Sequence, residues 1–139
     1  QPYRQDIFAP TSSVDVLPTL LHTLGRPIPE WCEGRVLPGF GDQATERDAA
    51  VLSIDGKYNA ADRPLQIATV ALIRDHYKLI RYFGYPGFHE KYELYILARD
   101  PEELEDLYHA RDLTATDLRY ELLARLQEAN QPYLFGPTR

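Results

Sequence analysis

The side chains best suited to nucleophilic, proton-transfer or metal chemistry in this sequence are one cysteine and four histidines: Cys32, His22, His76, His89 and His109. A single cysteine permits no internal disulfide. The histidines lack the i,i+4 and short-loop spacings that build a zinc site. The sequence also has no Gly-rich phosphate loop leading into a helix and no Gly-x-Ser-x-Gly nucleophile elbow. It therefore predicts neither a catalytic residue nor a metal site.

Two of the histidines, His76 and His89, fall in predicted loops at the ends of strands. Lys57 and Tyr58 fall in another predicted loop, at residues 55–63. Loops carried on a rigid sheet are where binding residues are often found. These four residues are therefore the candidate binding residues of the sequence, and we expect at least one of them to contact a ligand.

A run of carboxylates follows the last predicted strand. Asp100 before Pro101 is typical of a helix start, because Asp caps the helix, Pro occupies its first position and Glu103 reaches back to the cap. With Leu104 and Leu107 on its buried side, this segment is predicted to form a short helix. Carboxylates in a first turn complement the helix dipole. A solvated acidic face is therefore favoured over a cation site.

The N-terminal third predicts a short helix followed by an extended connection. Ser12, Ser13 and Asp15 can cap the helix, Pro18 is tolerated in its first turn, and Gly25 is a natural terminator. The connection that follows, up to residue 48, is rich in Pro and Gly and predicts an extended surface segment. The apolar residues of the helix are Val14, Leu17, Leu20, Leu21 and Leu24.

From residue 49 onward the apolar pattern changes to the period of two that is typical of strands. Only Asp75 and His76 separate the second and third strands, which indicates a tight hairpin. A second helix is predicted over 114–129, capped by Thr114, because its apolar residues recur at helical spacing. The predicted strands cover 49–54, 67–74, 77–83 and 92–96. The apolar stripe of the helix comprises Ala115, Leu118, Leu122, Leu126 and Ala129.

Together these elements predict an α+β fold. A small antiparallel sheet of about four strands has helices packed on one face, and a short helix with an extended Pro/Gly-rich connection precedes it. The predicted division places the first helix and the connection in residues 1–48, and the sheet with its helices in residues 49–139.

Composition narrows the class of protein further. The chain has 139 residues, 44% of them hydrophobic, and a net charge of −6. One domain of ordinary globular composition fits these values. The negative charge argues against nucleic acid and anionic membranes as partners, and no apolar run approaches the ~20 residues that span a bilayer. The sequence contains no methionine, not even at its start, so we expect it to be a piece of a longer protein.

Several stretches, taken in order, resemble one family. Residues 13–21 read Ser-Val-Asp-Val-Leu-Pro-Thr-Leu-Leu, and Gly-Arg-Val-Leu-Pro follows at 34–38. Residues 77–82 read Tyr-Lys-Leu-Ile-Arg-Tyr, while Glu-Leu-Tyr at 93–95 precedes Asp-Pro-Glu-Glu at 100–103. In this order the stretches resemble the part of sulfatases that follows the catalytic core. The resemblance is greatest to heparan N-sulfatase-type members of the alkaline-phosphatase superfamily. Ile96 and Asp106 depart from the family pattern, which usually has Asp and Asn there.

The resemblance implies a specific chemistry for a parent enzyme. Sulfatases hydrolyse sulfate esters or sulfamates with a formylglycine made from the Cys or Ser of a Cys/Ser-x-Pro-x-Arg motif, assisted by a divalent cation, usually calcium. Cys32 fails this motif, because Gly34 stands where Pro is needed and Arg35 comes one position early. No catalytic or metal-binding residue of the family has a counterpart in this sequence, so no cofactor is expected in this fragment. Calcium and formylglycine are implied for the parent only.

The same resemblance implies partners. The chain is expected to pack on the catalytic domain of the parent chain and to help form the wall of its cleft. The ligand is expected to be a sulfated small molecule or sugar, with Lys57, Tyr58, His76 and His89 as candidates for the rim. Separated from that domain, the first helix would expose an apolar surface, so self-association is expected. The alternatives are a phosphonate or phosphate-ester hydrolase of the same superfamily and a free-standing α+β interaction module.

Overall fold

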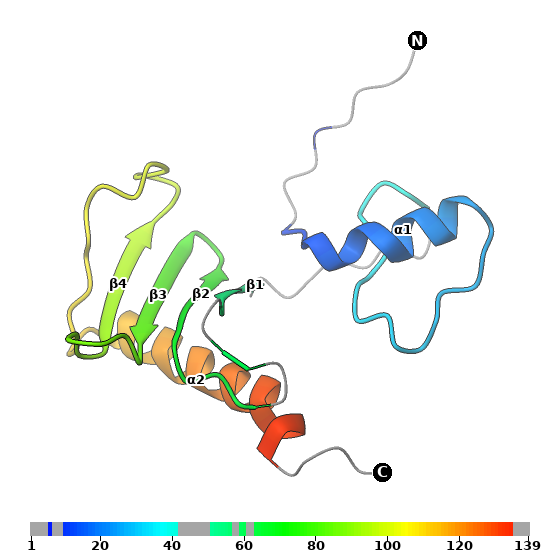
Figure 1. Ribbon diagram of the computed structural model, residues 1–139. Helices are drawn as coiled ribbons and strands as arrows, with labels where there is room; N and C mark the ends of the chain where they lie inside the picture. Colours follow the sequence, from blue (N-terminus) through cyan, green and yellow to red (C-terminus); the bar gives the residue numbers. More distant parts are fainter. Residues whose placement is uncertain (1–5, 7–9, 42–50, 57–58, 61–62, 135–139) are drawn as a thin grey trace. The chain divides into compact units, whose positions relative to one another are not determined.

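The computed structural model describes residues 6, 10–41, 51–56, 59–60 and 63–134. The chain divides into two compact units, Gln1–Val51 and Leu52–Arg139. Figure 1 shows the elements of both, with the strands in green to yellow and the long helix in orange.

The first unit is built on the predicted N-terminal helix. A turn of 3-10 helix, η1 (Ser13–Asp15), leads directly into α1 (Val16–Thr23). The backbone N–H of Ser12 donates to Asp15 Oδ2 at 2.8 Å, which closes the N-terminus. Pro18 lies in the first turn of α1, and Gly25 ends the helix with a left-handed φ of 62°. The prediction of a short, Gly-terminated helix is confirmed.

This helix buries polar side chains. Asp15 and Thr19 are 3% and 4% exposed. Asp15 Oδ1 accepts the N–H of Arg35 at 2.9 Å, and Thr19 Oγ1 accepts the N–H of Leu37 at 2.9 Å. Two backbone donors of the following connection are thus satisfied by side chains of the helix, as buried donors must be.

The connection is therefore not the free surface segment that its composition predicts. Val36 is 4% exposed. Gly34 lies so close to the helix that a Cβ there would be 1.9 Å from the carbonyl oxygen of Val14. The expectation is wrong for 34–37 because hydrogen bonds to buried side chains, which composition does not reveal, draw the backbone onto η1 and α1. The other side of the helix is apolar and exposed, and it comprises Val14, Val16, Leu17, Leu20 and Leu24.

The second unit is an open antiparallel sheet with strand order β1-β2-β3-β4. The predicted strands are confirmed to within two residues at each end. Asp75 and His76 form the two-residue turn between Arg74 and Tyr77, and Asp75 takes a left-handed φ of 56°. Asp tolerates this conformation better than most residues. The strands are β1 (Val51–Asp55), β2 (Ala68–Arg74), β3 (Tyr77–Phe83) and β4 (Lys91–Ile96).

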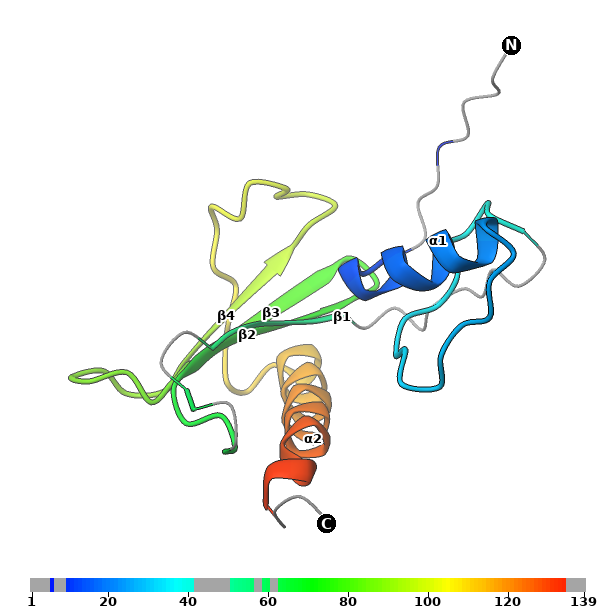
Figure 2. The same cartoon turned by 45° about the vertical axis from the view of Figure 1, so that its right-hand side comes forward.

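One face of the sheet is covered by α2 (Leu113–Leu134), as the nearly edge-on view of Figure 2 shows. The register pairs Leu72 with Leu79 and Leu79 with Leu94, which places these three leucines in one row on one face. The predicted stripe of α2 is buried as expected as far as residue 126, whereas Ala129 is exposed. The buried residues of the stripe are Ala115, Leu118, Leu122 and Leu126.

A second helix over the acidic run is not formed. Asp100 accepts the N–H groups of Leu104 and Glu105 at 3.0 and 2.9 Å, which closes one turn only. Glu103 has a φ of 58°, and a left-handed residue cannot continue a right-handed helix. Leu104, expected on the buried side, is 80% exposed. Of the helices predicted to pack on the sheet, α2 is therefore the one that the described residues contain.

The start of α2 also differs from the prediction. The helix begins one residue before Thr114, and Asp112 Oδ1 accepts the N–H of Ala115 at 3.0 Å. Asp112 is therefore the cap, because its carboxylate reaches the free N–H groups of the first turn.

The edge of the sheet at β4 is covered by the chain that follows it. The N–H of Leu94 donates to Asp106 Oδ1 at 3.0 Å, and the N–H of Leu107 donates to the carbonyl oxygen of Leu94 at 2.9 Å. Residues 106–107 thus take the place of a neighbouring strand at the middle of β4.

Truncating the centre of the stripe tests this core. Leu122 is fully buried, so Leu122→Ala should lower the free energy of unfolding by about 2–5 kcal/mol, the usual cost of removing a packed leucine. Leu104→Ala removes the same atoms from an exposed leucine and should change the free energy of unfolding by less than about 0.5 kcal/mol. Urea unfolding of both variants measures the difference. Equal midpoints would show that α2 does not pack on the sheet.

Candidate functional site

The structure separates the candidate binding residues. His76 lies in the turn between β2 and β3, at the start of β3, and His89 lies in the loop that follows the end of β3. Seven extended residues at about 3.3 Å each put roughly 20 Å between these two ends of the sheet. Lys57 and Tyr58 lie outside the described residues. The two described histidines therefore do not form a common site.

Aromatic rings gather at the end of the sheet that carries His89. The ring of Phe88 meets those of Tyr82 and Tyr85 edge-on, at centroid distances of 6.3 and 5.9 Å. The Tyr85 hydroxyl is 2.8 Å from Thr69 Oγ1 on β2, so the loop is attached to the sheet. Phe88 is nevertheless 42% exposed, and His89 is exposed. We call residues 84–90 the aromatic loop; it extends beyond the end of β3 at the far left of Figure 2.

The residues just before β2 lie against the aromatic loop. Asn59 Oδ1 accepts the N–H groups of Gln66 and Ile67 at 2.8 and 3.1 Å, and its Nδ2 donates to the carbonyl oxygens of Gly56 and Ile67 at 3.2 and 2.5 Å. A Cβ on Gly84 would lie 1.9 Å from the carbonyl oxygen of Gln66. The two loops are thus in backbone contact, and one asparagine organises the first of them.

Charged groups at this end are paired. Arg81 Nε donates to Glu90 Oε1 at 2.5 Å and its guanidinium lies 4.3 Å from the centroid of the Phe83 ring. Tyr92 donates its hydroxyl to the same Glu90 oxygen at 3.1 Å, and burial raises the pKa of Tyr92 to about 12. This arrangement holds the guanidinium over an aromatic ring.

The opposite end of the sheet is closed by the segment after β4. The N–H of Leu97 donates to the carbonyl oxygen of His76 at 2.7 Å, and the ring of His76 lies 4.3 Å from that of Tyr77. Lys78 Nζ donates to both oxygens of Glu103 at 2.7 Å. The turn that carries His76 is therefore backed by an acidic segment.

On the face opposite α2, Glu93 is the centre of a hydrogen-bond network. Its Oε2 accepts the hydroxyls of Tyr82 and Tyr95 at 2.8 and 3.1 Å, and its Oε1 accepts Lys91 Nζ at 2.5 Å. Burial alone would raise the pKa of Glu93, but the bonds from Lys91, Tyr82 and Tyr95 hold it below its ordinary value. Burial and the bond to Glu93 raise the pKa of Tyr95 to about 12. Each group of the network is satisfied by another, which is typical of a structural role.

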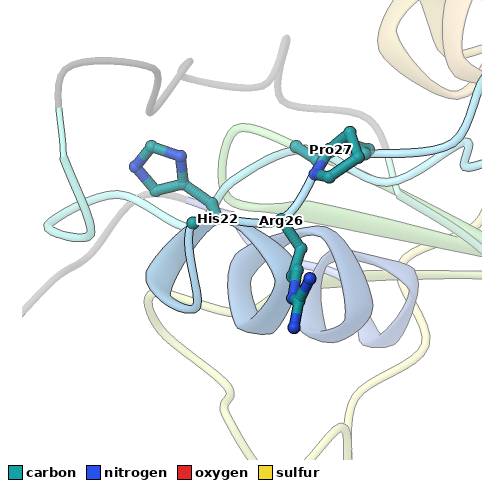
Figure 3. Close-up of a pocket in the computed structure, with 5 residues that line it drawn as sticks. His22, Arg26 and Pro27 are labelled. Carbon is teal, nitrogen blue, oxygen red and sulfur yellow. The ribbon is translucent and has the colours of Figure 1, made fainter.

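A pocket of about 580 Å³ lies at the C-terminal end of α1. Figure 3 shows His22 and Arg26 on its lining, with their side chains pointing to different sides. Helix C-termini carry partial negative charge on their free carbonyl groups. The pocket is thus poorly suited to an anionic ligand, although two basic residues line it.

Within the part of the chain that the structure describes, no group of three or more His, Cys, Asp or Glu residues could hold a metal ion. Cys32 is half-buried. No described helix is long and apolar enough to cross a bilayer.

The four-stranded sheet with its single covering helix defines a small α+β subdomain of the kind found at the C-terminus of sulfatases. The family model described as "N-sulphoglucosamine sulphohydrolase, C-terminal" matches residues 4–132, and the chain belongs to this family. The sulfatase resemblance of the sequence is therefore confirmed. No curated protein sequence matches the chain.

Solved structures share the fold. BT4656, solved in complex with its substrate D-glucosamine-2-N,6-O-disulfate, is 21% identical in sequence to this chain, with a TM-score of 0.57. The match covers 88% of this chain and 24% of BT4656. YidJ of Bacteroides fragilis, whose assignment as a sulfatase is provisional, is 21% identical in sequence, with a TM-score of 0.61. The match covers 86% of this chain and 25% of YidJ. A Bacteroides thetaiotaomicron protein, described in connection with the metabolism of multiple glycosaminoglycans, is 19% identical in sequence, with a TM-score of 0.54. The match covers 81% of this chain and 24% of that protein. The chain spans about a quarter of the length of these proteins.

The sequence indicated the two histidines of the sheet region but missed the residues that organise the aromatic loop. Tyr85, Phe88 and Asn59 carry no chemical motif. Two aromatic residues within a loop, rather than in a strand, were the available signal.

The Glu93 network predicts a pH dependence of stability. A carboxylate with a lowered pKa stabilises the fold above its ordinary pKa of 4.5, and this contribution is lost as the pH falls through the lowered value. Glu93→Gln should therefore cost about 1 kcal/mol at neutral pH and progressively less below pH 4.5. Urea unfolding between pH 3 and 7 measures this. The exposed Glu102→Gln is the matched control and should follow the wild-type curve; a constant difference for Glu93→Gln would contradict the prediction.

Proposed function

We propose that this chain is the C-terminal subdomain of a sulfatase that hydrolyses sulfate esters or sulfamates. The observation that carries the proposal is the family match over residues 4–132. The fold shared with BT4656, which was solved with a sulfated glucosamine, supports it. No observation on the described residues favours a phosphonate hydrolase or a free-standing interaction module instead.

The reactive groups of the parent enzyme would come from outside this subdomain. The residues present do not fit a formylglycine site, because Cys32 lacks the Pro and Arg positions of the motif. They do not fit a calcium site either, since the described residues contain no suitable cluster of carboxylates. The proposed contribution of this chain is to pack on the catalytic domain and to help form the wall of its cleft. In that wall, at least one of the sheet-end loops would hold the non-reacting part of a sulfated substrate.

The exposed apolar side of α1 supports the packing. Leu20 and Leu24 are 54% and 72% exposed, and Trp31 after the helix is 72% exposed. Apolar residues gathered in this way usually mark an interaction surface. We therefore propose that residues 1–48 contact the catalytic domain and that residues 49–139 form the sheet subdomain.

The first prediction of the proposal is that the purified chain is inactive by itself. It should release no 4-nitrophenol from 4-nitrophenyl sulfate, because it supplies neither nucleophile nor metal ligands, whereas the full-length parent should release it. Turnover by the chain that disappears in Cys32→Ala would contradict the prediction.

The second prediction concerns the exposed side of α1. Without the catalytic domain, this surface should drive the chain to self-associate, and Leu20→Lys with Leu24→Lys should restore the monomer because two charges oppose apolar contact. Sedimentation at increasing concentration measures the association. The matched control is Leu104→Lys with Leu134→Lys, which changes two exposed leucines of the second unit. A wild-type chain that stays monomeric at high concentration would contradict the prediction.

A further inference from the structure

We infer that the end of the sheet formed by the aromatic loop, and not the end formed by the His76 turn, faces the sulfated sugar in the parent enzyme. The inference rests on the proposed function, and it selects one of the two loop ends that the structure separates. Its residues are Phe88, Tyr85 and His89, with Gln66 and Ile67, the residues just before β2, beside them.

The first argument is the chemistry of the aromatic loop. Sugar rings present flat C–H faces, which pack well on exposed aromatic rings, and hydroxyl and sulfate oxygens, which accept hydrogen bonds. Phe88 is 42% exposed although its ring contacts Tyr82 and Tyr85, so a ring is held in place with a free surface. His89, next in sequence, is an exposed donor. The turn at His76 also exposes a ring, but it offers only the pair of His76 and Tyr77, whereas three rings meet at the aromatic loop.

The second argument is charge. At the His76 end the described carboxylates, Asp75, Asp100, Glu102 and Glu103, outnumber the cations, Arg74, Lys78 and Arg99. Backbone hydrogen bonds from Leu104 and Glu105 lower the pKa of Asp100, so this carboxylate stays ionised. A sulfate would be repelled there. At the other end the described charges balance, with the cations Arg63, Arg81 and Lys91 and the carboxylates Asp55, Glu90 and Glu93, so a sulfate meets no net negative charge there.

The third argument is preorganisation. The aromatic loop is fixed to β2 by the contact between Tyr85 and Thr69, and Gly84 packs it on the backbone of Gln66. Asn59 fixes the neighbouring connection with four hydrogen bonds to backbone groups. A loop that is already ordered loses little entropy when a ligand binds. An exposed ring on an ordered loop is what a specificity contact requires.

The test uses the full-length parent enzyme and two substrates. One is a sulfated glucosamine tetrasaccharide prepared from heparin, which is large enough to reach a rim, and the other is 4-nitrophenyl sulfate, which is not. Phe88→Ala and His89→Ala should each raise KM for the tetrasaccharide by about fivefold or more and leave kcat/KM for the aryl sulfate within about twofold, because only the larger substrate loses a contact. His76→Ala, the matched control at the other end of the sheet, should change neither.

Two further variants exclude a simple loss of structure. Phe88→Leu keeps an apolar side chain but removes the flat ring, and His89→Gln keeps a hydrogen-bond donor. Phe88→Leu should raise KM for the tetrasaccharide nearly as much as Phe88→Ala, whereas His89→Gln should restore much of the wild-type value. Thermal unfolding of all variants should remain at the wild-type midpoint.

The outcomes separate the inference from the proposed function. A wild-type enzyme that hydrolyses neither sulfate overturns both. An enzyme that hydrolyses both substrates, with Phe88→Ala and His89→Ala unchanged or with a selective effect only in His76→Ala, overturns the inference and leaves the proposed function intact.

Discussion

The leucine layer between α2 and the centre of the sheet is the interaction on which the second unit depends. Leu72 and Leu79 face Leu118 and Leu122, and all four are fully buried. Burying a leucine contributes about 1.5–3 kcal/mol, and an open sheet gains a stable face only by covering it. Arg74 at the end of β2 also forms an ion pair with Glu121 of the helix, at 2.6 Å. Because this layer holds β2 and β3 in place, the loops at both ends of these strands are attached to a rigid support.

Much of the second unit could be predicted from the sequence because its signals are local and redundant. Alternating apolar residues identify the strands, and two residues between Arg74 and Tyr77 allow only a tight turn. The acidic run shows where such signals fail. Asp100 followed by Pro101 begins a helix and a single capped turn equally well, and the difference arises three residues later, where Glu103 becomes left-handed and pairs with Lys78. That contact is distant in sequence, so no local pattern contains it.

The first unit illustrates a different gap between sequence and structure. The apolar residues of α1 predict a buried face, yet within its own unit the helix buries Asp15 and Thr19 instead. Periodicity identifies which residues share a face, but not what covers that face. The candidate binding residues show a similar gap. His76 and His89 could be assigned to the two ends of one predicted strand, whereas the contact that attaches the loop around His89 to β2 could not be predicted. The contact of the Phe88 ring with Tyr82 on β3 could not be predicted, because no local pattern shows how the loop folds back on the strand.

The covering of β4 by residues 106–107 has a consequence for how the protein avoids aggregation. An exposed edge strand offers a row of free N–H and carbonyl groups to any other extended chain. At Leu94 both groups are already used within the molecule, by Asp106 and Leu107. A strand from another copy would have to displace these two hydrogen bonds before it could add there. Fibril-like growth of the sheet is therefore hindered at the middle of β4.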